Sequence, residues 1–146
     1  MYQYTAEEWF DSGEGTVTLL GSTKFFFECM EISRQLTFKK WIVLSCGSWG
    51  HSYHKYQMNP NTDYSGVKTL HYYKILDSNA VVVVSDSSKY IGDSTKAEIE
   101  FSKYINLPVF YYDGSQLTGQ TTSYPPKRNF SAIIAEFAEL NKGLGF

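Results

Sequence analysis

The stretch Ala80-Val-Val-Val-Val84 decides the fold class, because all of its side chains are apolar and four of them are β-branched. β-Branched residues pack well in strands. A strand that is apolar at consecutive positions, rather than at alternate ones, has both faces buried, as in the centre of a parallel sheet. We therefore predict a buried parallel strand over 80–84.

Short apolar runs alternate with helix-like segments on both sides of this strand. The strand-like runs cover 16–20, 41–45 and 108–112, and the helix-like segments cover 25–38, 65–76, 95–105 and 129–142. Strands that alternate with helices indicate βαβ units, whose crossovers are right-handed. The order predicts a doubly wound α/β fold, with a mostly parallel sheet of four to five strands flanked by helices. The segment 113–127 is polar and is predicted to be a loop.

Apolar faces on the predicted helices indicate which side chains form the core. In the segment 25–38 the apolar face is ragged and contains Phe26, Phe27, Met30, Arg34 and Leu36. The last helix has a clearer stripe of Phe130, Ile133, Ile134, Phe137 and Leu140. We also expect core positions for Phe25, Phe101, Tyr104 and Phe110.

Length and composition predict one domain over 1–146 and exclude several classes of protein. The chain is 42% hydrophobic and has only two cysteines, which argues against a disordered protein or a disulfide scaffold. No apolar run approaches the length of a membrane span. The net charge of −2 gives no general attraction to nucleic acid or to a membrane. The N-terminal stretch has no signal-peptide pattern, so we expect a cytoplasmic protein.

Ligands of doubly wound sheets bind beyond the carboxyl ends of the strands. The loops at that edge are predicted to be 21–24, 46–63 and 85–93. In the first, Gly21, Ser22 and Thr23 lie between a strand and a helix, where backbone N–H groups suit an anion such as phosphate. The alternative is a plain turn in which Ser22 or Thr23 caps the helix.

A second candidate anion site lies at the start of the segment 95–105. Gly92 permits close approach of the backbone to a ligand, and Ser94 and Thr95 offer hydroxyl groups. Glu98 follows in the first turn of the predicted helix. The structural alternative is a capping box, in which Glu98 folds back onto its own helix start and Thr95 is the N-cap.

The histidines and cysteines do not indicate a metal site. His51 and His54 share a loop that has no carboxylate or cysteine at good ligand spacing, so we expect no metal. Cys46 has no basic neighbour that would activate its thiol, and packing is its expected role. His71, taken alone, is interpreted as a surface residue of the segment 65–76.

A longer pattern is more specific than any of these features. It consists of Leu70-His71-Tyr-Tyr-Lys74-Ile75, Asn79-Ala-Val-Val-Val-Val84, Tyr90-Ile-Gly92-Asp93-Ser94-Thr95-Lys-Ala-Glu98-Ile-Glu100 and Pro108-Val-Phe-Tyr111. This pattern resembles the nucleoside 2-deoxyribosyltransferase-like superfamily, and its small bacterial and phage members in particular. The Gly21-Ser22 turn is similar to a turn of the same superfamily. The resemblance covers about residues 16–112 and is strongest over 70–112.

The resemblance implies a flavodoxin-like or Rossmann-like fold and cleavage of an N-glycosidic bond, by hydrolysis or by transfer. The implied substrate is a deoxynucleoside or its 5′-monophosphate, and no cofactor is implied. The nucleophile implied by the resemblance corresponds to Glu98. The chemistry is consistent with this role, since a carboxylate beneath C1′ stabilises or bonds to an oxocarbenium-like centre. The implied phosphate and sugar contacts are Gly21, Ser22, Gly92, Ser94 and Thr95.

One position departs from the pattern, because several members of the superfamily have an Asp where this chain reads Leu70-His71-Tyr72-Tyr73. His71 or Asp63 is the candidate acid–base residue instead, and a His pKa near neutrality suits that role. The tyrosine excess, 12 of 25 aromatic residues, suggests a pocket that stacks on a nucleobase. Its candidate residues are Trp49, Tyr53, Tyr56 and Tyr90.

Two alternatives remain open at the level of sequence. The first is a non-catalytic nucleotide-binding sensor or sequestering protein, suggested by the missing Asp. The second is a TIR-like NAD⁺ hydrolase, which shares the architecture and a catalytic Glu but fits the spacing less well. The expected partners are a small nucleoside or nucleotide and, since relatives often pair through helices, a second copy of the chain in a homo-oligomer.

Overall fold

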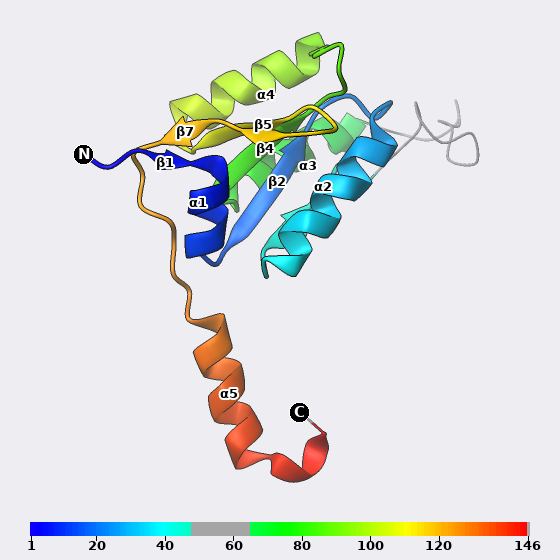
Figure 1. Cartoon of the computed structure of the whole chain (residues 1–146). Coiled ribbons are helices and arrows are strands. Elements are labelled where there is room, and N and C mark those ends of the chain that lie inside the picture. The colour runs from blue at the N-terminus through cyan, green and yellow to red at the C-terminus, as the bar shows by residue number, and fades with distance from the viewer. Residues whose placement is uncertain (48–64, 146) are drawn as a thin grey trace.

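The computed structural model describes residues 1–47 and 65–145 of the chain (Figure 1). Its centre is a five-stranded sheet in which four neighbouring strands are parallel and the edge strand β6 is antiparallel. The strands lie in the spatial order β3 (Ile42–Leu44), β2 (Thr16–Leu20), β4 (Ala80–Val84), β5 (Val109–Tyr112) and β6 (Leu117–Thr118). The predicted α/β sheet is therefore confirmed, and it is mixed at one edge.

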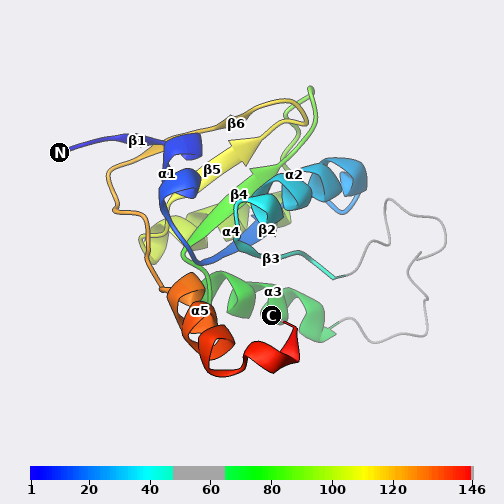
Figure 2. The same cartoon turned by 60° about the horizontal axis from the view of Figure 1, so that its bottom comes forward.

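Helices cover both faces of the sheet, as Figures 1 and 2 show. Alternate side chains of a strand point to opposite faces. Val82 and Val84 of β4 pack with α1 (Ala6–Ser12) and α2 (Phe26–Phe38). Val81 and Val83 pack with α3 (Ser65–Leu76) and α4 (Asp93–Tyr104). This explains why all five residues of β4 are buried.

The chain reverses its direction across the sheet between β2 and β4. It runs outward from β2 through α2 to β3, and then returns through α3 to β4 on the other side of β2. Open α/β sheets bind ligands at such a switch point, outside the carboxyl ends of the strands. The loops that follow β2 and β4 therefore have the best position for a ligand.

The N-terminal segment, for which we predicted no element, forms the helix α1. Thr5 and Glu8 make a reciprocal capping box at its start, and its residues Trp9 and Phe10 are fully buried. The strand β1 (Tyr4–Thr5) before it pairs with β7 (Gln120–Thr121). The prediction of a loop over 113–127 is therefore wrong for β6 and β7, which pair with β5 and β1 respectively.

The buried face of α2 agrees with the predicted one at Leu36 but differs from it at Phe27 and Met30. Cys29, Ile32 and Leu36 point to the core, whereas Phe27 is 72% exposed and Met30 is also exposed. The helix is apolar on two sides, so periodicity did not identify the inner side. The core position predicted for Tyr104 is wrong in the same way, because that residue lies on the outer side of α4 and is 82% exposed.

The last helix, α5 (Phe130–Leu140), stands apart from the sheet and its helices (Figure 1). A short 3-10 helix, η2 (Lys142–Leu144), follows it. The predicted helix is confirmed, but none of its residues is buried, so the core position expected for its apolar stripe is wrong. Within the described ranges, no helix is long and apolar enough to cross a bilayer.

Candidate functional site

The carboxyl ends of β2 and β4 approach each other closely at Gly21. This residue has φ = +145°, and a Cβ atom placed on it lies 2.5 Å from the carbonyl oxygen of Val84. Only glycine accepts both this backbone conformation and this contact. The turn that the sequence predicts as an anion site therefore requires glycine at position 21, next to the end of β4.

We expect Gly21→Ala to lower the free energy of unfolding by about 2–3 kcal/mol, because the new methyl group strains the backbone and meets a carbonyl oxygen. Urea unfolding followed by circular dichroism measures the loss. Gly66→Ala is the matched control, since a Cβ at Gly66 meets nothing within 4 Å and alanine favours the helix. Equal stability of the two variants contradicts the close approach of β2 and β4.

A cation and two aromatic rings connect the loops after β2 and β4. The Lys24 ammonium lies 3.7 Å from the centroid of the Tyr90 ring and 5.2 Å from that of Phe25. Such contacts are attractive because the ring face is electron-rich. Nearby, two hydrogen bonds from Ser88 lower the pKa of the Asp86 carboxyl, with a smaller contribution from Lys24. Tyr90, predicted to stack on a base, already has Lys24 over one ring face.

The start of α4 differs from the capping interpretation of Glu98. The helix begins at Asp93, its N-cap is Gly92, and no side chain caps it. Thr95 is buried inside the first turn instead of being the N-cap, while Ser94 is exposed. The capping-box alternative is therefore wrong. The uncapped first-turn N–H groups leave the helix start able to hold an anion.

Glu98 lies in the buried stripe of α4, together with Thr95, Ile99 and Ser102. The helices α3 and α4 cover the same face of the sheet, and this brings His71 against Glu98. Nε2 of His71 is 2.9 Å from Oε2 of Glu98, and the two side chains are only 14% and 12% exposed. A histidine and a carboxylate at this distance and this burial are candidates for acid–base and nucleophilic chemistry on a bound substrate.

Two buried polar atoms of the described residues have no hydrogen bond of normal geometry, Glu98 Oε2 and Thr23 Oγ1. For Glu98 this holds despite the 2.9 Å contact, since the contact is close in distance but not aligned as a hydrogen bond. Buried groups without such partners are rare in folded proteins and call for an explanation. Both belong to segments that follow the switch-point strands, which suggests that a polar ligand satisfies them.

Ser22 does not cap α2, whose N-cap position is Phe25 without a side-chain cap. Instead, its hydroxyl accepts a hydrogen bond from the backbone N–H of Lys24, 3.3 Å away, so the capping alternative is wrong for Ser22. Thr23, which belongs to the same predicted anion-binding turn, is not the N-cap either. The sequence does not show that the Thr23 hydroxyl is buried without a hydrogen bond; only the structure identifies it as a candidate ligand contact. The predicted residues Trp49, Tyr53, Tyr56 and Asp63 lie outside the described residues.

Cys29 is not a candidate nucleophile at this site. It forms no disulfide, and burial raises the pKa of its thiol to about 12, so it stays protonated at neutral pH. Among residues 1–47 and 65–145, no group of three His, Cys, Asp or Glu side chains is arranged to hold a metal ion. Glu98 and His71 are therefore the groups with chemistry at the switch-point edge.

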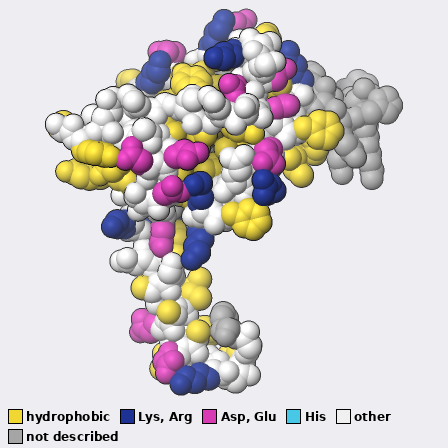
Figure 3. Space-filling model, viewed as in Figure 1, with side chains coloured by type: hydrophobic (Ala, Val, Ile, Leu, Met, Phe, Trp, Pro, Cys, Tyr) yellow, Lys and Arg dark blue, Asp and Glu magenta, His cyan; other side chains and the backbone are white. Residues whose placement is uncertain are grey.

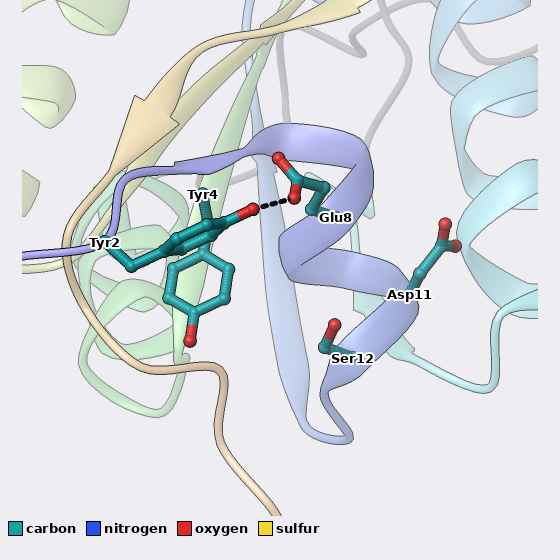
Figure 4. A pocket seen from close by; sticks show the side chains of 5 residues that line it. All are labelled: Tyr2, Tyr4, Glu8, Asp11 and Ser12. Atoms are coloured by element: carbon teal, nitrogen blue, oxygen red, sulfur yellow. Dashed lines mark hydrogen bonds between the residues drawn. The ribbon is translucent and has the colours of Figure 1, made fainter.

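A surface hollow of about 470 Å³ lies elsewhere, beside β1 and α1 (Figure 4). The Tyr2 hydroxyl donates a hydrogen bond to Glu8 there, which lowers the pKa of that carboxyl. The lining includes two carboxylates and no cation, which does not suit a phosphate. It is lined by Tyr2, Tyr4, Glu8, Asp11 and Ser12.

Comparison with protein-family models, with curated proteins and with solved structures found no match for this chain. The candidate site therefore depends on its own geometry and on the sequence pattern.

Proposed function

We propose that this flavodoxin-like protein cleaves the N-glycosidic bond of a deoxynucleoside 5′-monophosphate, with Glu98 as nucleophile. The observation that carries the proposal is the buried Glu98 carboxylate, 2.9 Å from His71 and with Oε2 lacking an aligned hydrogen bond. A buried carboxylate oxygen without an aligned hydrogen bond is available to stabilise a positively charged centre of a substrate. The oxocarbenium-like carbon of glycosidic cleavage is such a centre.

The remaining residues at the edge suit a nucleotide. The uncapped start of α4 and the turn at Gly21 offer backbone N–H groups for the 5′-phosphate, and Lys24 adds a positive charge beside them. With the phosphate at the helix start, Glu98 lies in the second turn of the same helix. This separation limits repulsion between the phosphate and the nucleophile.

The reaction then proceeds in two steps. The C1′–N bond breaks with its electron pair moving to the base, His71 gives a proton to the base, and Glu98 bonds to C1′. Water, or a second base, then attacks C1′ and displaces Glu98, while His71 takes back a proton. The first outcome is hydrolysis and the second is transfer.

The direct test is incubation of the pure protein with a panel of deoxynucleoside monophosphates and chromatography for free base. Release of base from at least one member supports the proposal. If no base appears from any of them, with or without an added acceptor base, the enzyme proposal is refuted.

A second candidate function is nucleotide binding without turnover. It is favoured by one observation: His71, rather than a second carboxylate, faces Glu98, whereas most glycosidases use two carboxylates. In this case calorimetry shows saturable binding of a monophosphate that is recovered intact. Absence of both binding and base release contradicts both functions.

We expect His71→Asn to lower the rate of base release by about 10²-fold or more, because loss of a general acid has effects of this size. Asparagine keeps a polar group near Glu98 but carries no titratable proton. The loss is expected to be smaller for substrates whose base is a better leaving group, since those need less protonation. A rate equal to that of the wild type excludes His71 as the proton donor.

A further inference from the structure

The start of α5 is fixed to the body of the protein by specific hydrogen bonds. The Glu14 carboxylate accepts from the backbone N–H of Phe130 and from the hydroxyl of Ser131, both at 2.9 Å. One residue earlier than the N-cap, Arg128 donates to the Asn79 side chain at 2.6 Å. These bonds set the direction in which α5 leaves the body, so α5 does not fold back as a loose tail.

The projecting helix has an apolar face that is largely open to solvent (Figure 3). At 3.6 residues per turn its large apolar side chains fall within about 120° of one another, on a stripe about 15 Å long. Monomeric proteins rarely expose such a stripe. Its members, with η2, are Ile133, Ile134, Leu140 and Leu144, which are 58–78% exposed.

The same chain carries a second stripe of matching length on the outer side of α2. Phe27, Met30, Arg34 and Phe38 lie within about 80° of one another over about 16 Å of helix. The three apolar members are 57–76% exposed, and the Arg34 guanidinium lies over the Phe38 ring at 5.7 Å. Of the face of α2 that was predicted to be core, Phe27, Met30 and Arg34 are therefore exposed, whereas Leu36 is buried.

The helix α5 has two acidic residues, Glu136 and Glu139, and no basic one. An acidic amphipathic helix is poorly suited to an anionic membrane surface, where lysine and arginine are needed. The charges do not select a protein partner, because Arg34 on α2 is already paired with Glu31 at 2.8 Å and Glu139 lies 3.0 Å from Lys142. The partner of the α5 stripe is therefore an apolar protein surface of matching length.

We propose that two copies of this chain exchange their α5 helices, so that α5 of each copy lies on the α2 stripe of the other. A two-fold axis makes the two contacts equivalent and closes the dimer. Taking about 200 Å² for a fully exposed large apolar residue, the two stripes expose on the order of 1,000 Å² per copy. A standard stable interface buries about 800 Å² per partner, so the exchange supplies enough surface.

The test measures the molar mass of the full chain by light scattering across a range of concentrations. The wild type is expected at twice the 16.7 kDa of one chain. Ile133→Glu on α5 and Phe38→Glu on α2 are each expected to give a monomer. The controls Ala135→Glu, on the other side of α5, and Tyr104→Glu, at an equally exposed aromatic on α4, are expected to stay dimeric.

Mixing the two disrupted variants gives a sharper test. A mixed dimer of Ile133→Glu and Phe38→Glu retains one intact contact, between the wild-type α5 of one copy and the wild-type α2 of the other. A 1:1 mixture is therefore expected to recover dimer that neither variant forms alone. A monomeric wild type, a Phe38→Glu variant that stays dimeric, or a mixture without recovery overturns the exchange, and the last two outcomes point to pairing of α5 with another surface.

Discussion

Replacement of Glu98 by glutamine is expected to reduce base release from a deoxynucleoside monophosphate by about 10³-fold or more, since loss of a nucleophile has at least this effect. Glutamine has nearly the same shape as glutamate but can neither bond to C1′ nor stabilise its positive charge well. The measurement is single-turnover release of the base, followed by chromatography. Binding of the intact nucleotide, measured by calorimetry, is expected to persist.

The fold of this variant is expected to be unchanged, because glutamine has nearly the same volume as glutamate and leaves neither a cavity nor an overlap in the buried stripe of α4. Glu100→Gln is the matched control, since Glu100 is on the same helix but its side chain is 76% exposed. If Glu98→Gln unfolds the protein, or releases base as fast as Glu100→Gln does, Glu98 is a structural residue.

The central βα units were predictable because their signals are local. The strand β4 is apolar at every position, and the structure has it over the predicted residues Ala80–Val84. The helix α3 likewise covers the predicted segment, Ser65–Leu76. Both elements obtain their identity from periodicity and propensity within a few residues. Their order along the chain then restricts the topology to few arrangements.

The elements at the sheet edges were missed for the opposite reason. The helix α1 is too short to show a helical period, and it is held by distant partners, such as the Ser123 carbonyl that accepts from the Trp9 indole. The strands β6 and β7 have two residues each. Their existence depends on pairing with β5 and β1, which no local pattern encodes.

The candidate site was predictable in part. The sequence indicated Glu98, Gly92 and Gly21 individually, because glycine at a turn and a carboxylate in a helix's first turns are readable signals. The contact of His71 with Glu98 was not readable, since it requires that α3 and α4 share one face of the sheet. Thr23 could not be distinguished from Ser22 without knowing which hydroxyl is buried.

Trp9→Ala is expected to lower the free energy of unfolding by about 3–5 kcal/mol, as for other large aromatic residues removed from a core. The Trp9 ring is 1% exposed. It stacks on Trp41 at a centroid distance of 5.2 Å and contacts Phe10 and Phe110 at 5.3 and 5.4 Å. Its removal leaves a cavity among the large side chains by which α1 packs on β2, β4 and β5. Chemical unfolding followed by circular dichroism measures the loss.

The comparison with Trp9→Phe separates packing from the hydrogen bond. Phenylalanine retains much of the ring contact but not the 3.1 Å bond from Nε1 to the Ser123 carbonyl, so a loss of intermediate size is expected. Tyr104→Ala, which removes an exposed ring, is expected to change stability by less than about 0.5 kcal/mol. A Trp9→Ala loss as small as that of Tyr104→Ala contradicts the buried position of α1. A large loss instead indicates that α1 unfolds together with the sheet, as one cooperative unit. The Trp9 ring contacts both Trp41 and Phe110, so α1 cannot detach without breaking its contacts with the core of the sheet.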